Sequence, residues 1–308
     1  MEIALQFVLL ALGFVMLGKG ADWFVEGAAG IAMRFGIPQL VIGLTIVAMG
    51  TSAPEAAVSI AAAVKGNADI TIGNIVGSNI LNILVILGLA ASIVPIAVAR
   101  STVRIEIPFM IGVTALLFYQ GRDGSISLAD GGVLMVAFAA YMMYLYTMAM
   151  KSNVDSDLEE PGLPLGRCLL GAVGGLALII AGSNVTVGAA TSIATYAGLS
   201  ERFIGLTIVA LGTSLPELFT SVAAARRGNA DIAIGNIVGS NIFNILFVVG
   251  LSALIIDIPF ASAFNFDTYV ALGAAVLLLL CVLRTQRLQR WAGALMLVCY
   301  AAYLGYIL

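Results

Sequence analysis

The 308-residue chain contains no histidine, few charged residues and only three cysteines. The absence of histidine excludes Ser-His catalysis, imidazole proton relays and most zinc, copper and haem sites. Charged residues make up 10% of the chain, whereas a soluble globular domain has about 25%. Because 61% of the residues are hydrophobic, the composition predicts a protein embedded in a lipid bilayer.

Other features exclude further classes of protein. The sequence has no basic stripe, so nucleic acid is not an expected partner. The cysteines Cys168, Cys281 and Cys299 lie in or beside apolar runs without metal-ligand spacing, which predicts buried apolar roles. No cofactor is expected. The first apolar run lacks a basic leader and a small-residue cleavage site, which favours a retained span over a signal peptide.

Long apolar runs fill almost the whole chain. A membrane helix needs about 20 predominantly apolar residues, and ten segments meet this need. The sequence therefore predicts an all-α membrane protein with ten transmembrane helices and no room for a soluble domain. The expected spans are 3–25, 38–64, 70–94, 103–120, 126–149, 165–190, 202–225, 232–256, 268–284 and 290–308.

The lysines and arginines orient these spans, because basic loops stay in the cytoplasm. Loops after even-numbered spans hold only Lys65, Arg122 and Arg202. All the other basic residues belong to loops after odd-numbered spans or, for Lys19, to the same side of the membrane. We therefore expect both termini outside and a cytoplasmic linker, "KSNVDSDLEEPGLP", at 151–164.

Part of the sequence occurs twice. Residues 36–90 align with 198–252 without a gap, at an offset of 162, and 36 of the 55 positions are identical. Five expected spans separate the copies, so they would cross the membrane in opposite directions. Such inverted repeats are typical of secondary transporters. The pattern predicts a first five-helix repeat at 1–150 and an inverted second one at 165–308.

The repeated segments "AMGTSAPE" (48–55) and "ALGTSLPE" (210–217) place a helix breaker and a carboxylate inside apolar runs. Pro54 has no N–H to donate to the carbonyl of Gly50. We therefore expect the helix to loosen and to leave carbonyls near Ala48–Thr51 without intrahelical partners, which is costly in hydrocarbon unless a cation binds them. The second copy predicts the same around Ala210–Thr213.

The spacing places several polar residues at one depth. Glu55 lies 11 residues before the Gly66 turn and Ser78 lies 12 after it. Both are thus roughly 16–18 Å from the turn, near the middle of a core about 30 Å thick. Thr51 with Glu55, and Ser78 with Asn82, are i and i+4 pairs on one helix face. The second copy supplies Thr213, Glu217, Ser240 and Asn244.

The combined set offers only oxygen ligands, which suits a hard cation such as Ca²⁺ or Na⁺. Two ionised glutamates would balance one Ca²⁺ or two Na⁺. An unpaired charge at this depth is expensive, so an occupied site should change sides more easily than an empty one. This reasoning favours exchange over one-way transport.

The motifs "GTSAPE" with "GNIVGSNILN", and "GTSLPE" with "GNIVGSNIFN", resemble the two alpha-repeats of the cation/calcium exchanger superfamily, and most closely those of the prokaryotic sodium/calcium exchangers. The resemblance implies a Ca²⁺/Na⁺ antiporter, working as a monomer in a prokaryotic cytoplasmic membrane. It places a central site between spans 2, 3, 7 and 8, with spans 1 and 6 sliding across it. Its implied ligands are Ala48, Thr51, Ser52, Glu55, Ser78, Asn82, Ala210, Thr213, Ser214, Glu217, Ser240 and Asn244.

Asn244 departs from the pattern, because archaeal relatives and potassium-dependent members of the superfamily carry an acidic residue there. Potassium coupling is therefore not expected. Proton/calcium exchangers of the superfamily also have Asn in these positions, so a H⁺/Ca²⁺ antiporter stays open as the alternative.

Two roles stay open for Asn74 and Asn236, which lie one turn before Ser78 and Ser240. They could bond freed carbonyls or help to coordinate the cation.

An intramembrane enzyme is not expected, because the chain lacks histidine and paired aspartates in adjacent spans. A passive channel is disfavoured too, since two buried carboxylates should hold Ca²⁺ too tightly for rapid conduction.

Overall fold

The computed structural model describes residues 2–66, 68–152, 163–198 and 210–307, which are almost entirely helical. Within these ranges, eight helices are long and apolar enough to cross a membrane, and one bent helix pair would add a ninth. The chain is a multi-pass membrane protein. The start of the expected span 202–225 and most of the linker 151–164 lie outside the described residues.

The first half consists of helices joined by short turns. Its elements, in order, are α1 (Glu2–Arg34), α2 (Gln39–Ile42), η1 (Gly43–Val47), α3 (Ala48–Thr51), α4 (Ala53–Val64), α5 (Asp69–Leu81), η2 (Asn82–Leu87), α6 (Gly88–Ile93), β1 (Ile96–Ala97), η3 (Thr102–Glu106), α7 (Ile107–Gln120), η4 (Gly121–Asp123), β2 (Ser125–Ile126) and α8 (Leu128–Ser152).

Where it is described, the second half repeats this order except that η3 and η4 have no counterparts. Its elements are α9 (Leu165–Tyr196), α11 (Ala210–Thr213), α12 (Leu215–Arg226), α13 (Ala230–Phe243), η6 (Asn244–Val249), α14 (Gly250–Ile255), β3 (Ile258–Pro259), α15 (Phe264–Leu283), β4 (Arg287–Leu288) and α16 (Arg290–Ile307). The two-residue strands pair antiparallel, β1 with β4 and β2 with β3, and so tie loops of the two halves together.

The helix breaks lie in the repeated motifs, as the sequence predicts. α3 ends at Thr51, α4 begins at Ala53, and the two segments of this span are bent by 51° at Ser52. Pro54 lies in the first turn of α4, where its missing N–H breaks no helical bond. The second copy is interrupted in the same way at Ser214, between α11 and α12.

The prediction that the carbonyl of Ala48 lacks an intrahelical partner is wrong. This oxygen accepts the backbone N–H of Ser52 at 3.0 Å. The physical reason is the register of the proline. The N–H that Pro54 lacks would have bonded Gly50, so the last α-helical bond before the break reaches back to Ala48.

Four described segments are π-helical, which the sequence analysis does not predict. Two of them, η2 and η6, begin at Asn82 and Asn244, which are equivalent positions in the two repeats. A π-turn is wider than an α-turn and is often found at functional sites. Asn82 and Asn244, the two predicted amide ligands, therefore lie where an α-helix changes to a π-helix.

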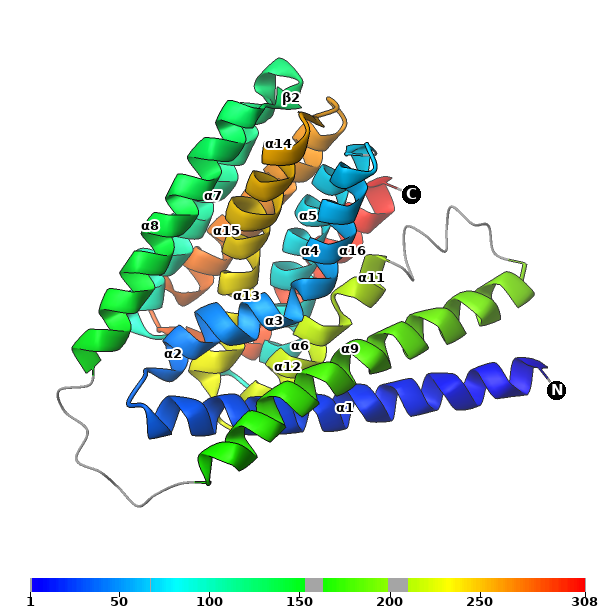
Figure 1. Ribbon diagram of the computed structural model, residues 1–308, viewed down its shortest axis with the longest axis vertical. Helices are drawn as coiled ribbons and strands as arrows, with labels where there is room; N and C mark the ends of the chain where they lie inside the picture. The colour runs from blue at the N-terminus through cyan, green and yellow to red at the C-terminus, as the bar shows by residue number, and fades with distance from the viewer. Residues whose placement is uncertain (1, 67, 153–162, 199–209, 308) are drawn as a thin grey trace.

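The two longest helices, α1 and α9, lie side by side and cross the direction of the other long helices (Figure 1). Both extend beyond the expected spans 3–25 and 165–190. They pack antiparallel, because Gly13 meets Gly182 while Gly27 meets Ala172. A Cβ atom on Gly20 would lie 2.8 Å from the carbonyl oxygen of Gly175. This glycine seam brings the backbones into direct contact, as small residues do in membrane helix pairs.

Two salt bridges connect α1 to the end of α12. Arg227, just after α12, contacts both Asp22 and Glu26 on α1, each at 3.2 Å. These side chains are 35–44% exposed, so the pairs contribute little to stability on their own. They fix where α1 lies against the end of α12.

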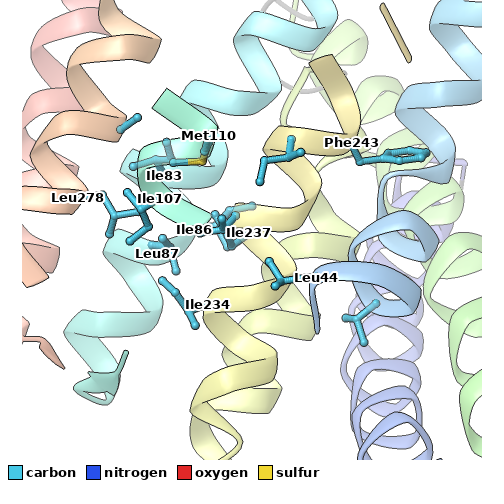
Figure 2. Packing of buried hydrophobic residues seen from close by; sticks show 14 of the residues in the cluster. Leu44, Ile83, Ile86, Leu87, Ile107, Met110, Ile234, Ile237, Phe243 and Leu278 are labelled. Atoms are coloured by element: carbon cyan, nitrogen blue, oxygen red, sulfur yellow. The ribbon is translucent and has the colours of Figure 1, made fainter. Parts of the chain in front are cut away.

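The remaining helices enclose an aliphatic core. Figure 2 shows buried side chains of the two halves packed against one another, with β-branched and leucine residues filling the space between helices. The labelled residues are Leu44, Ile83, Ile86, Leu87, Ile107, Met110, Ile234, Ile237, Phe243 and Leu278. This packing holds the two polar helix breaks in a rigid surround.

We expect Gly27→Ala to destabilise the protein. The added Cβ would lie 2.4 Å from the backbone nitrogen of Ala172, so the helices must separate at a cost of about 1–3 kcal/mol. The melting temperature in detergent should fall by about 2–5 °C. Gly18→Ala is the matched control, because nothing lies within 4 Å of its Cβ position. Equal melting temperatures for the two variants would contradict the seam.

Candidate cation site

The two helix breaks meet at the centre of the structure through crossed hydrogen bonds. Ser52 donates its hydroxyl to Glu217 Oε1 at 2.7 Å. Ser214, its repeat equivalent, donates to Glu55 Oε1 at 3.2 Å. Each serine thus bonds the glutamate of the other half. The structure brings together the two carboxylates that the sequence analysis predicts to converge.

These glutamates are dehydrated and only partly satisfied. Glu55 and Glu217 are each 1% exposed, and their carboxylates are close enough to interact electrostatically. Each has one oxygen, Oε2, without a hydrogen-bond partner among the described residues. The side-chain oxygens of Asn82 and Asn244 are buried and unpartnered in the same way. Such oxygens are costly in a protein interior unless a donor or a cation meets them.

The other predicted ligands divide into two groups. Ser78, Ser240 and Thr51 are buried; Ser240 donates to the carbonyl of Ala48 at 3.3 Å. The Thr51 hydroxyl lies 3.0 Å from Asn236 Oδ1 and also within reach of its own helix. By contrast, Thr213 is half-buried at the end of α11.

Ala210 opens α11, so its backbone stands at the position equivalent to Ala48. In the first repeat, Ala48 accepts hydrogen bonds from Ser52 and Ser240. Its carbonyl is therefore already used within the protein, and the side-chain oxygens are the better cation ligands.

Asn74 and Asn236 bond serine hydroxyls and the backbone oxygens of the two glutamates, which lie beyond the carbonyls expected to be freed at Ala48–Thr51 and Ala210–Thr213. Asn74 donates to Ser59 at 2.9 Å and to the backbone oxygen of Glu55 at 3.3 Å. Asn236 makes the equivalent bonds to Ser221 at 2.9 Å and to Glu217 at 3.4 Å. Each asparagine thus braces the first turn of the helix that carries a glutamate.

The sequence analysis missed Asn79 and Asn241. Each donates its Nδ2 to the other's backbone oxygen at 3.2 Å. Their side-chain oxygens accept from the predicted ligands, Asn244 to Asn79 at 3.1 Å and Asn82 to Asn241 at 2.9 Å. A signal was present, because Asn79, Asn241, Ser59 and Ser221 are identical polar residues at the repeat offset.

A third buried glutamate lies away from this cluster. Glu106 of η3 is fully buried and accepts a hydrogen bond from Tyr144 of α8. The equivalent residue in the second repeat is Thr268, so a comparison of the two repeats does not single out Glu106. Its Oε2 also has no partner among the described residues. The pairing with tyrosine distinguishes Glu106 from the serine-bonded pair at the centre.

The central cluster can surround a hard cation with oxygen. Carboxylates, hydroxyls and amide oxygens are the ligands that Ca²⁺ and Na⁺ prefer. In the part of the chain that the structure describes, no group of three or more His, Cys, Asp or Glu side chains gathers. Two carboxylates therefore carry the negative charge of the cluster.

Comparison with known proteins gives a consistent result. The profile of the family described as "Sodium/calcium exchanger protein" matches residues 5–147 and again 168–308. CaxA of Alkalimonas amylolytica, named as a candidate antiporter, is 41% identical, with 98% of both chains covered. The sodium/calcium exchanger MaX1 of Methanosarcina acetivorans is 33% identical, again with 98% of both chains covered.

Solved structures of the sodium-calcium exchanger NCX_Mj have the same membrane fold. One of them, soaked with zero Na⁺ and Ca²⁺, superposes with a TM-score of 0.87 at 33% identity, covering 99% of this chain and 100% of the other. The resemblance inferred from the repeated motifs is confirmed by these matches over both halves of the sequence. The chain belongs to the sodium/calcium exchanger protein family, and it is accordingly a membrane transporter of cations.

Proposed function

We propose that this protein exchanges Ca²⁺ for Na⁺ across the membrane, binding either cation at the central cluster. The observation that carries the proposal is the pair of buried glutamates, Glu55 and Glu217, each with an oxygen that no described residue satisfies. Two ionised carboxylates balance one Ca²⁺ or two Na⁺. The names of MaX1 and NCX_Mj, both sodium/calcium exchangers, support the same pair of ions.

The proposed site lies between the second, third, seventh and eighth spans. In the described residues these are α3–α4, α5–η2, α11–α12 and α13–η6. The proposed ligands are those of the sequence analysis except the carbonyl of Ala48, which is already bonded by Ser52 and Ser240. The cross-half bonds from Ser52 and Ser214 support this choice, because they bring both repeats to one cluster.

We further propose ten spans in two inverted halves, 1–150 and 165–308, joined by a cytoplasmic linker at 151–164. The family profile matches once in each half, and pairs such as Asn79 and Asn241 bond reciprocally at the repeat offset. The distribution of basic residues supports termini on the outside. The prokaryotic relatives support a prokaryotic cytoplasmic membrane as the location.

The physics of the cluster favours obligatory exchange. Two like charges in a dehydrated pocket repel each other, and moving such a pocket from one side to the other without a counter-ion is expensive. Ca²⁺ or Na⁺ removes that cost. The transport cycle therefore changes sides with a cation bound, which couples the two gradients.

Glu55→Gln and Glu217→Gln should each abolish Ca²⁺ exchange and leave a folded protein. Loss of one charged partner from a buried site costs about 3–5 kcal/mol, so transport should fall on the order of 100-fold or more. The measurement is ⁴⁵Ca²⁺ uptake into vesicles, with size-exclusion profiles as the check on folding. Glu26→Gln, at an exposed glutamate of α1, is the control. Normal Ca²⁺ uptake by either central variant rejects the site.

Sodium and proton coupling are separated by a gradient experiment. Vesicles loaded with Na⁺ and diluted into Na⁺-free buffer at clamped pH should take up ⁴⁵Ca²⁺. If uptake instead needs a pH gradient and ignores Na⁺, the protein is the alternative H⁺/Ca²⁺ antiporter. Uptake should also respond to membrane potential when the exchange moves net charge.

Asn244→Asp should keep Ca²⁺ binding, because a carboxylate also offers oxygen to the cation. The extra negative charge should change how strongly Na⁺ competes with Ca²⁺. Competition between NaCl and ⁴⁵Ca²⁺ for the purified variant measures this. Complete loss of Ca²⁺ binding would show that position 244 does not tolerate a carboxylate ligand.

A further inference from the structure

The proposed amide ligands, Asn82 and Asn244, must be turned the right way to bind a cation, whereas the carboxylates need no particular orientation. A carboxylate presents an oxygen to a cation whichever way it turns, whereas an asparagine can present either its oxygen or its NH₂ group. Only the oxygen can coordinate. If Asn82 or Asn244 turned its NH₂ inward, the cation would lose a ligand and meet a partial positive charge.

Backbone geometry decides the orientation of Asn79 and Asn241. The side chain of Asn241 meets the backbone carbonyl of Asn79 at 3.2 Å, and Asn79 meets that of Asn241 at the same distance. A carbonyl oxygen can only accept, so each side chain must present its NH₂ group there. The side-chain oxygens of both residues are thereby directed the other way.

The orientation of Asn82 and Asn244, which bond these side-chain oxygens, is then fixed as well. Asn82 meets the oxygen of Asn241 at 2.9 Å, and Asn244 meets that of Asn79 at 3.1 Å. Both must present NH₂ to an acceptor, so the oxygen of each faces away from it. These oxygens, Asn82 Oδ1 and Asn244 Oδ1, are the buried unpartnered atoms described above.

We infer that Asn79 and Asn241 are positioning residues, which orient the amides of Asn244 and Asn82 so that each presents oxygen to the transported cation. The inference rests on the proposed function and assigns roles to two residues outside its ligand set. Each positioning residue acts on the ligand of the other half. All four side chains are at most 3% exposed, so no bulk water competes for their hydrogen bonds.

The two halves thus depend on each other for ligand geometry. Partners that orient the ligands of a metal site change its affinity by about 10–100-fold when they are removed. Asn79→Leu keeps the approximate volume but removes the acceptor, so the Asn244 amide loses its constraint. The apparent affinity for Ca²⁺ should fall about 10-fold or more.

A double-mutant cycle separates positioning from packing. With Asp at position 244 both terminal atoms are oxygens, so the cation meets oxygen in either orientation, and the carboxylate has no hydrogen to donate to Asn79 Oδ1. The effect of Asn79→Leu on the dissociation constant of ⁴⁵Ca²⁺ should shrink to about 3-fold or less in the Asn244→Asp background. The mirrored cycle uses Asn241→Leu with Asn82→Asp and should give the same result. Ser252→Ala, which removes a buried hydroxyl that has no partner among the described residues, should leave Ca²⁺ binding unchanged.

The outcomes are distinct. The inference is overturned if Asn79→Leu changes the dissociation constant of ⁴⁵Ca²⁺ equally in both backgrounds, and Asn241→Leu does the same in its two backgrounds. The proposed function then stays intact. Absence of Ca²⁺ binding by the unsubstituted chain removes the proposed function and the inference with it. If the Leu variants do not fold, Asn79→Ala and Asn241→Ala take their places in the cycles. Failure of these to fold as well assigns the pair a purely structural role and overturns the proposal.

Discussion

Two carboxyl groups that repel each other are held in one buried compartment, and the surrounding structure accommodates that repulsion. Glu55 and Glu217 each accept a hydrogen bond from a serine hydroxyl of the opposite half. Asn74 and Asn236 brace the helix turns on which they stand. A rigid aliphatic surround keeps the two from separating. Negative charge on the pair is therefore concentrated in one place, and under the proposed function a cation neutralises it.

The helix breaks explain how this concentration is possible in a membrane. A continuous helix would bond its own backbone throughout and leave no local freedom at mid-depth. The interruptions at Ser52 and Ser214 turn a hydroxyl toward the other repeat, and the prolines start new helices whose first turn holds a glutamate. A helix N-terminus carries partial positive charge, which helps to hold a carboxylate there.

Much of this could be predicted from the sequence, because the decisive residues are polar and occur twice. The repeat offset identified both glutamates, both breaks and the family. The π-turns at Asn82 and Asn244 were not predicted, because hydrophobic periodicity does not distinguish a π-turn from an α-turn. The bonding of the Ala48 carbonyl was predicted wrongly, because the proline affects a different acceptor. Asn79 and Asn241 were overlooked because a polar residue next to a ligand looks like packing until its partners are known.

The glycine seam between α1 and α9 has a consequence for how the sequence can vary. At Gly20, Gly27 and Gly175 the facing backbones leave room for a hydrogen atom alone, so any larger side chain forces the two helices apart. The outward faces of the same helices carry large, exposed apolar side chains such as Leu5, Val8 and Leu170, where replacement by another apolar residue meets no facing backbone. Within α1 or α9, substitutions on the face at the seam are therefore expected to be far more damaging than substitutions on the outward face.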